Sequence, residues 1–135
     1  MHAQGIPVLL ARILLALVFI GAGIEKFTGL EGTAGYIASA GLPMPKLLAV
    51  ASAVVEVLGS VLLILGWQAR WAALALAGFT LLASVFFHNY WAMPADQQFM
   101  QQLMFMKNLA ITGGLLMVFA FGPGTLSVDQ RRAAA

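Results

Sequence analysis

The chain has 135 residues, of which 61% are hydrophobic and 9% are charged. Soluble domains carry about 25% charged residues, and a chain this short has too little interior to hide so much apolar surface. The composition therefore excludes an ordinary soluble domain and predicts a single-domain polytopic membrane protein. The net charge of +2 rests on few residues and no basic run, which argues against nucleic-acid binding. The sequence holds no cysteine, which excludes disulfides and thiolate chemistry within the chain.

The first predicted membrane span covers about residues 7–27. Arg12 lies inside it, and its long stem would let the guanidinium reach back to the lipid headgroups. Gly21 and Gly23 are positions at which a second helix could approach closely. The span ends near Lys26, at the opposite membrane interface.

The linker after the first span is too polar to cross a bilayer and is expected to form an interfacial helix over about residues 30–40. The second predicted span then covers residues 47–65. This span is apolar except for Glu56 near its middle. A run of this length matches the hydrocarbon core, about 30 Å thick. A lone charge at such a depth costs at least about 2.5–3.5 kcal/mol, so Glu56 requires a partner, a proton or a water-filled cavity.

A tight turn at residues 66–70 makes the second and third spans antiparallel neighbours. The third span is predicted at residues 71–87 and the fourth at about 99–121, with a polar loop over residues 92–98 between them. The fourth span carries Lys107 and Asn108 within it, and the remaining residues then lie outside the membrane.

The distribution of lysine and arginine predicts the orientation of the chain. Four spans place both ends on one side of the membrane. That side would hold four basic residues, and the other side two, Lys26 and Lys46, accompanied by acidic residues. We therefore expect an all-α integral membrane four-helix bundle with both termini in the cytoplasm, in a bacterial cytoplasmic (inner) membrane.

Helical spacing places Glu56 on a face of the second span that otherwise carries only small residues. Small and polar faces turn inward in membrane bundles. Counted from the non-cytoplasmic interface, Glu56 and Lys107 lie at nearly the same depth, so we expect them to be neighbours. The sequence thus predicts a polar pocket in the non-cytoplasmic half, built from Glu56, Lys107, Asn108, His88, Lys26 and Glu25.

His88 admits two interpretations. It either anchors the bundle by a hydrogen bond or bonds to a quinone carbonyl, with Tyr90 and Trp91 beside it as candidates for stacking on a ring. His2 lies in the N-terminal tail, so a bis-histidine haem or a histidine-rich metal site is not expected within one chain.

The order and spacing of six stretches resemble the DoxX family of small four-span membrane proteins. These stretches are RILLALVFIGAGIEKF, AGYIASAGLPMP, EVLGSVLLILGWQAR, FFH, KNLAITGGLL and GPGTLSVD. The family is named for a subunit of an archaeal thiosulfate:quinone oxidoreductase, and some members are linked to oxidant defence. The resemblance carries over Lys26, Glu56, Arg70, His88, Lys107 and Asn108, whereas Glu25 is less typical of the pattern.

Three functions remain open at this point. The first is an accessory or quinone-interacting subunit of a membrane oxidoreductase system. It would have no redox centre of its own, so electrons would come from a partner or a bound cofactor, and quinone is the candidate cofactor. The second is a small-solute or proton-coupled transporter that uses Glu56 and Lys107. The third is a membrane scaffold without catalysis, in which the two groups only keep the helices in register. The expected partners are the lipid bilayer and either a second copy of the chain or a redox protein.

Overall fold

The structure is a computed structural model that describes residues 5–135, so His2 lies outside the described residues. The elements in chain order are α1 (Gly5–Thr28), α2 (Leu30–Ser39), α3 (Pro45–Leu65), α4 (Ala69–Phe87), the short 3-10 turn η2 (Tyr90–Ala92), α5 (Ala95–Phe121) and α6 (Val128–Ala133). Four of these helices are long and apolar enough to cross a membrane. The predicted all-α membrane fold is confirmed.

The helix boundaries follow local chemistry, with one departure from expectation. Gly66 ends α3 in the left-handed conformation, with φ of 67°, and the short turn after it makes α3 and α4 antiparallel. The polar loop predicted over residues 92–98 is shorter, because α5 begins at Ala95. Pro94 precedes the helix and Asp96 lies in its first turn, where an acidic side chain interacts favourably with the helix dipole.

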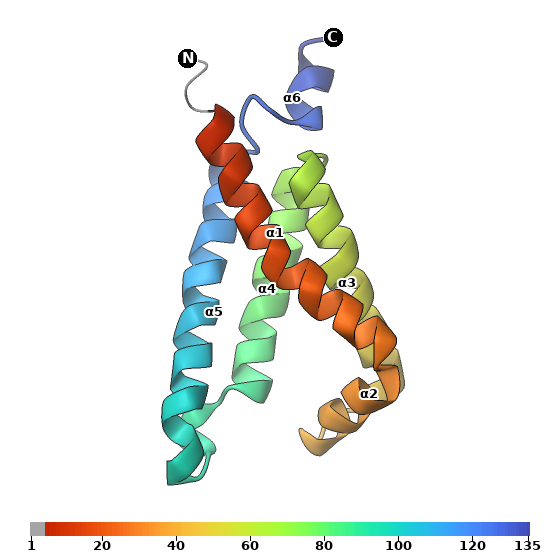
Figure 1. Ribbon diagram of the computed structural model, residues 1–135, viewed down its shortest axis with the longest axis vertical. Coiled ribbons are helices and arrows are strands. Elements are labelled where there is room, and N and C mark those ends of the chain that lie inside the picture. Colours follow the sequence, from red (N-terminus) through yellow and green to blue (C-terminus); the bar gives the residue numbers. More distant parts are fainter. Residues whose placement is uncertain (1–4) are drawn as a thin grey trace.

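The long helices are arranged as two pairs (Figure 1). Helix α1 packs along α3, and α4 packs along α5, while α3 and α4 join the two pairs. The start of α1 and the C-terminal α6 lie at the same end of the bundle, and the pairs diverge toward the other end, where α2 packs against α3 (Figure 1).

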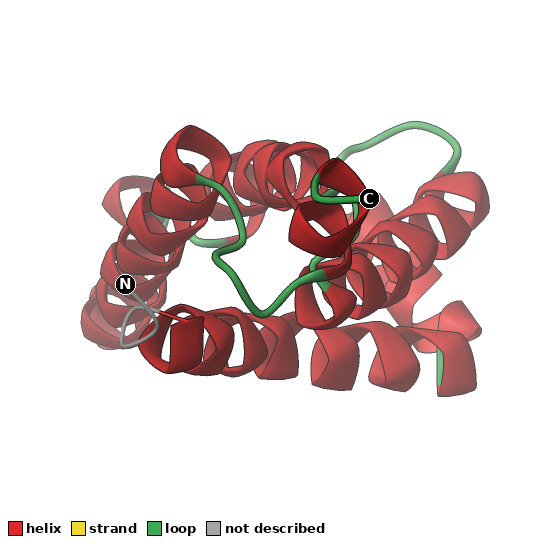
Figure 2. Cartoon of the chain, turned by 90° about the horizontal axis from the view of Figure 1, so that it is seen from above, coloured by secondary structure: helices red, strands yellow, loops and turns green. Residues whose placement is uncertain are grey.

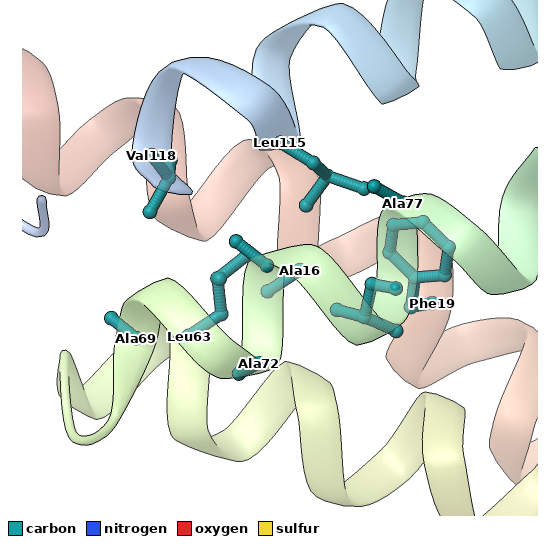
Figure 3. Packing of buried hydrophobic residues seen from close by; sticks show 10 residues of the cluster. Ala16, Phe19, Leu63, Ala69, Ala72, Ala77, Leu115 and Val118 are labelled. Atoms are coloured by element: carbon teal, nitrogen blue, oxygen red, sulfur yellow. The ribbon is translucent and has the colours of Figure 1, made fainter. Parts of the chain in front are cut away.

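The interior is built largely from small side chains, as the small-residue faces predicted. Figure 3 shows the central cluster, in which alanines of α1 and α4 let the larger side chains of the neighbouring helices meet. Leu63, Leu76 and Leu115 are completely buried within it. The large aliphatic residues elsewhere on the helices are exposed, as expected for surfaces in contact with lipid.

The chain after α5 turns back over the bundle instead of leaving it (Figure 2). The carboxylate of Asp129 accepts hydrogen bonds from the backbone N–H groups of Gln68 and Ala69, at 2.8 and 3.0 Å, and so caps α4. The backbone N–H of Asp129 in turn donates to the carbonyl of Gly66, at 2.9 Å. The C-terminal segment, residues 122–133, therefore closes this end of the bundle.

The expectation that Arg12 reaches the headgroups is wrong. Its side chain is completely buried, and its guanidinium donates to the carbonyls of Leu63, at 3.1 Å, and of Leu126. The carbonyls at the end of a helix have no partner within the helix and carry partial negative charge. The Leu63 carbonyl also accepts from the backbone N–H of Gly66, so Arg12 adds a second, charged donor at the end of α3 and ties the C-terminal segment to it.

Candidate functional site

The buried carboxylate of Glu56 is paired with Lys26. Nζ of Lys26 lies 2.7 Å from Oε2 of Glu56, and the side chains are 26% and 5% exposed. Helices α1 and α3 can approach closely here because α1 carries Gly23 one turn before Lys26. A methyl group added at Gly23 would lie 2.7 Å from Cγ2 of Val57 and 3.1 Å from Cβ of Glu56.

The sequence-based expectation named a different cation. Lys107 was expected beside Glu56 because the two residues lie at similar depth, but within residues 5–135 the salt bridge of Glu56 is with Lys26. Depth alone does not fix a partner, since it leaves the rotation of each helix undetermined. Lys107 lies on the exposed side of α5, and its side chain lines the same cavity.

The ion pair is set into the wall of a cavity of about 530 Å³ between α1, α2, α3, α4 and α5, which we call the Glu56 cavity. Its polar side chains include Lys26, Glu56, His88, Lys107 and Asn108. The rest of the lining is predominantly aliphatic and aromatic. Cavities of about 300–1,000 Å³ with apolar walls and a few convergent polar groups are typical of small-molecule sites.

His88 and Asn108 both line the cavity while holding α4 and α5 together. Nδ1 of His88 lies 2.7 Å from the side-chain oxygen of Gln101. Because an amide oxygen accepts, this contact favours a proton on Nδ1 and leaves Nε2 as an acceptor in the neutral ring. The Asn108 amide N–H donates to the hydroxyl of Ser84 at 3.0 Å, and the side-chain oxygen of Asn108 takes no part in that contact.

Three of the predicted site residues lie away from the cavity lining. Glu25 is exposed and is not part of the cavity lining. Tyr90 and Trp91 pack against each other and against Phe105, with edge-to-face ring centroids 5.3–5.6 Å apart. The structure thus places these two rings at the junction between η2 and α5, and their stacking on a ligand stays a prediction.

The aromatic residues that do line the cavity come from other elements. Tyr36 of α2 and Phe87 of α4 stack with their ring centroids 4.9 Å apart. Sequence reasoning missed Tyr36 because it lies on the short α2, outside every predicted span. The sequence did hold a signal: Thr33, Tyr36 and Ile37 have the spacing of residues on one face of a helix. In the structure all three line the cavity.

The arrangement provides hydrogen bonds and charge. The Lys26 ammonium has three N–H donors, of which Glu56 takes one. Within residues 5–135, no group of three or more histidine, cysteine, aspartate or glutamate side chains is placed to hold a metal ion. An ammonium with free N–H donors in an apolar-walled cavity is suited to recognition of a polar group on an apolar body.

The chain is similar to known membrane proteins. The model of the DoxX family matches residues 7–89. The chain is 39% identical to inner membrane protein YphA of Escherichia coli (strain K12) over 129 residues, which cover 96% of this chain and 92% of that protein. It is 40% identical to inner membrane protein YqjF of the same organism over 130 residues, or 94% and 92% of the two chains.

More distant similarity extends to eukaryotes. A Surfeit locus protein 4 homolog of Drosophila melanogaster is 28% identical over 82 residues, which are 57% of this chain and 30% of that protein. No solved structure matches. The family match includes Lys26, Glu56 and His88, whereas Lys107 and Asn108 lie in the part aligned with the two E. coli proteins. Together with the four apolar helices, these similarities identify an integral inner-membrane protein.

Proposed function

The chain belongs to the DoxX family, and from this we propose that it is a quinone-binding accessory subunit of a membrane oxidoreductase system. The quinone would be held in the Glu56 cavity. The proposal places both termini in the cytoplasm and the cavity in the non-cytoplasmic half of the bilayer, in keeping with the distribution of basic residues.

The observation that carries the proposal is an ion pair with free donors inside an apolar cavity of suitable size. A quinone head is a flat apolar ring with two carbonyl acceptors. Lys26 retains N–H donors beyond the one that Glu56 accepts at 2.7 Å, and one of these would bond to a carbonyl. Glu56 would hold the ammonium in place, while the aliphatic and aromatic walls would accommodate the ring and the start of the tail.

Reduction of a quinone requires protons as well as electrons. Nε2 of His88 is an acceptor in the ring tautomer favoured by the contact with Gln101, and His88 lines the cavity with Lys26 and Glu56. Side chains of this kind can exchange protons with a bound quinone but do not carry electrons. In this proposal the electrons come from a partner redox protein in the same membrane.

Binding of ubiquinone-2 to the protein in phosphatidylcholine nanodiscs tests the proposal. Lys26→Met removes a charge-assisted hydrogen bond worth about 1.5–3 kcal/mol, so we expect the Kd to rise about tenfold or more. Glu31→Gln is the matched control, since Glu31 is 85% exposed and pairs with Lys46 outside the cavity. We expect that variant to bind ubiquinone-2 as the wild type does.

The proposal fails if ubiquinone-2 and menaquinone-4 both partition into discs with and without the protein to the same extent. It also fails if Lys26→Met and Glu56→Gln bind both quinones as tightly as the wild type. If the Lys26→Met/Glu56→Gln double variant assembles and supports its partner as the wild type does, the protein is instead a scaffold.

A further inference from the structure

Lys107 is a charged residue near the middle of a membrane-spanning helix with no acidic partner. The ion pairs formed by residues 5–135 join Lys26 to Glu56 and Lys46 to Glu31. Lys107 thus lies more than 4.0 Å from every carboxylate that the structure describes. Lys107 is exposed and lies about halfway along α5.

The charges around the Glu56 cavity do not balance. Two lysines and one glutamate line it, and Lys26 already neutralises Glu56 at 2.7 Å. The surplus is therefore one positive charge, located at Lys107. An unpaired cation in the hydrocarbon region is costly, and such residues normally pair with a counter-charge or mark a ligand pathway.

The mouth of the cavity is lined by exposed apolar side chains. Three residues of the lining, Val18, Leu82 and Phe86, are 47%, 62% and 44% exposed, although they lie within the membrane-spanning helices α1 and α4. Surfaces with this composition at this position face acyl chains. A molecule that reaches Lys107 along this route must be soluble in the bilayer.

We propose that the mouth of the Glu56 cavity binds one anionic membrane amphiphile, with its acidic head on Lys107 and its acyl chain along the apolar wall. A phosphate or carboxylate with one negative charge matches the surplus charge. Asn108 is already bonded to Ser84, so Lys107 is the group that distinguishes an anionic head from a neutral one. The flexible four-carbon stem lets the ammonium follow a head toward the membrane interface.

This inference is distinct from quinone binding, because it depends on Lys107 and on charge, whereas the quinone proposal depends on Lys26 and on a neutral ligand. The anionic head could come from a phospholipid or from a free fatty acid. The two share an acidic group on an acyl chain and can be separated by experiment.

Electron spin resonance of spin-labelled lipids tests the inference. The wild-type chain is reconstituted in phosphatidylcholine vesicles at pH 8 with spin-labelled phosphatidylglycerol, stearate or phosphatidylcholine. The motionally restricted fraction of each label gives its relative association constant. A basic group that reaches the membrane interface favours an acidic lipid about fivefold. Because the stem of Lys107 lets its ammonium follow a head toward the interface, we expect a preference of that order for one or both acidic labels.

Lys107→Met should bring that preference close to that of phosphatidylcholine, and Lys107→Arg should retain it. Lys46→Met is the matched control, because Lys46 lies outside the cavity and pairs with Glu31, and it should retain the preference as well. Preference for phosphatidylglycerol alone would identify a phospholipid, and preference for stearate alone a free fatty acid.

Two results would overturn the inference. One is equal association of all three labels with the wild-type chain. The other is a preference for acidic labels that Lys107→Met leaves unchanged, since the charge responsible would then lie elsewhere. Either result leaves the binding of ubiquinone-2 to the Lys26 side of the cavity untouched, so the two proposals fail separately.

Discussion

At the scale of single residues, the pairing of Glu56 with Lys26 resolves the energetic problem of an acid within a membrane span. The carboxylate is 5% exposed, and its cation lies 2.7 Å away on the neighbouring helix. Such pairs specify how helices fit together more than they stabilise the fold, because desolvation offsets the attraction. Lys26 also lines the cavity and keeps N–H donors that Glu56 does not use, so a structural role and a binding role are compatible.

A double-mutant cycle identifies the partner of Glu56. Breaking a buried pair costs about 3–5 kcal/mol, and partial exposure of Lys26 lowers our expectation for Glu56→Gln to about 1–3 kcal/mol. Glu56→Gln leaves the Lys26 ammonium without its carboxylate, and Lys26→Met removes that unpaired charge. The double variant Glu56→Gln/Lys26→Met should therefore be more stable than the sum of the single changes predicts. The free energy of unfolding in mixed detergent micelles, followed by circular dichroism, measures this coupling.

A second double-mutant cycle, of Lys107→Met with Glu56→Gln, is the control for that experiment. The effect of Lys107→Met should add to that of Glu56→Gln within about 0.5 kcal/mol, as for residues that do not interact directly. Strong coupling of Glu56 to Lys107 and none to Lys26 would contradict the structure.

At the scale of elements, the crossing of α1 over α3 sets the position of Lys26. The two helices meet at Gly23, where a side chain would overlap Val57. Gly21 was expected to serve the same purpose but is exposed, with nothing within 4 Å of an added methyl group. The two glycines lie two residues apart and so point to different faces of the helix.

These glycines offer a matched pair of substitutions. Gly23→Ala should destabilise the protein by about 1–3 kcal/mol, because the added methyl group forces α1 away from α3. Gly21→Ala should be neutral or stabilising by up to about 1 kcal/mol, since alanine favours a helix more than glycine does. Thermal unfolding of both variants in detergent checks the difference, and equal effects would show that the helices do not meet at Gly23.

Arg12 connects three elements at the other end of the bundle. Arg12→Met removes the guanidinium donor from the carbonyls of Leu63 and Leu126 and leaves a gap where a completely buried side chain stood, so we expect a loss of about 2–4 kcal/mol in the free energy of unfolding. Arg70→Met is the control: its guanidinium also donates to two carbonyls at 3.0 Å, but the residue is exposed. We expect it to cost less than about 1 kcal/mol, because water can replace the donor. A larger loss for Arg70→Met than for Arg12→Met would contradict this account.

At the scale of the whole molecule, the two helix pairs meet at one end and diverge at the other. The C-terminal segment closes the end where the pairs meet, and the Glu56 cavity lies between the pairs beyond it. The Glu56 cavity therefore lies toward one side of the membrane, and the orientation of the chain decides which side that is.

Cysteine labelling determines that orientation, since the natural sequence contains no cysteine. The bias of basic residues predicts that a membrane-impermeant maleimide labels Gln97→Cys in intact spheroplasts and Ala135→Cys only after permeabilisation. Both positions are exposed in the structure. The reverse pattern would place the termini outside the cytoplasm and the cavity in the cytoplasmic half.

The sequence by itself determined the class of fold and the faces that turn inward. Hydrophobic runs separated by turns predicted four long helices, and the small residues around Glu56, such as Ala53, Gly59 and Ser60, are buried as expected. These features follow from the length of each run and from helical periodicity, which are local properties of the chain. The family resemblance rests on the same order of segments and is confirmed by the match over residues 7–89.

The tertiary structure decided which of the inward-facing groups touch. Depth along each span put Glu56 level with Lys107, but the rotation and crossing of α1 gave the contact to Lys26. Likewise, the burial of Arg12 depends on the return of residues 122–133 over the end of the bundle, more than 100 positions away in the chain, as the contact with Leu126 shows. Periodicity assigns a residue to a face of its own helix, whereas a partner is fixed by the packing of two helices against each other, and only the folded bundle contains that information.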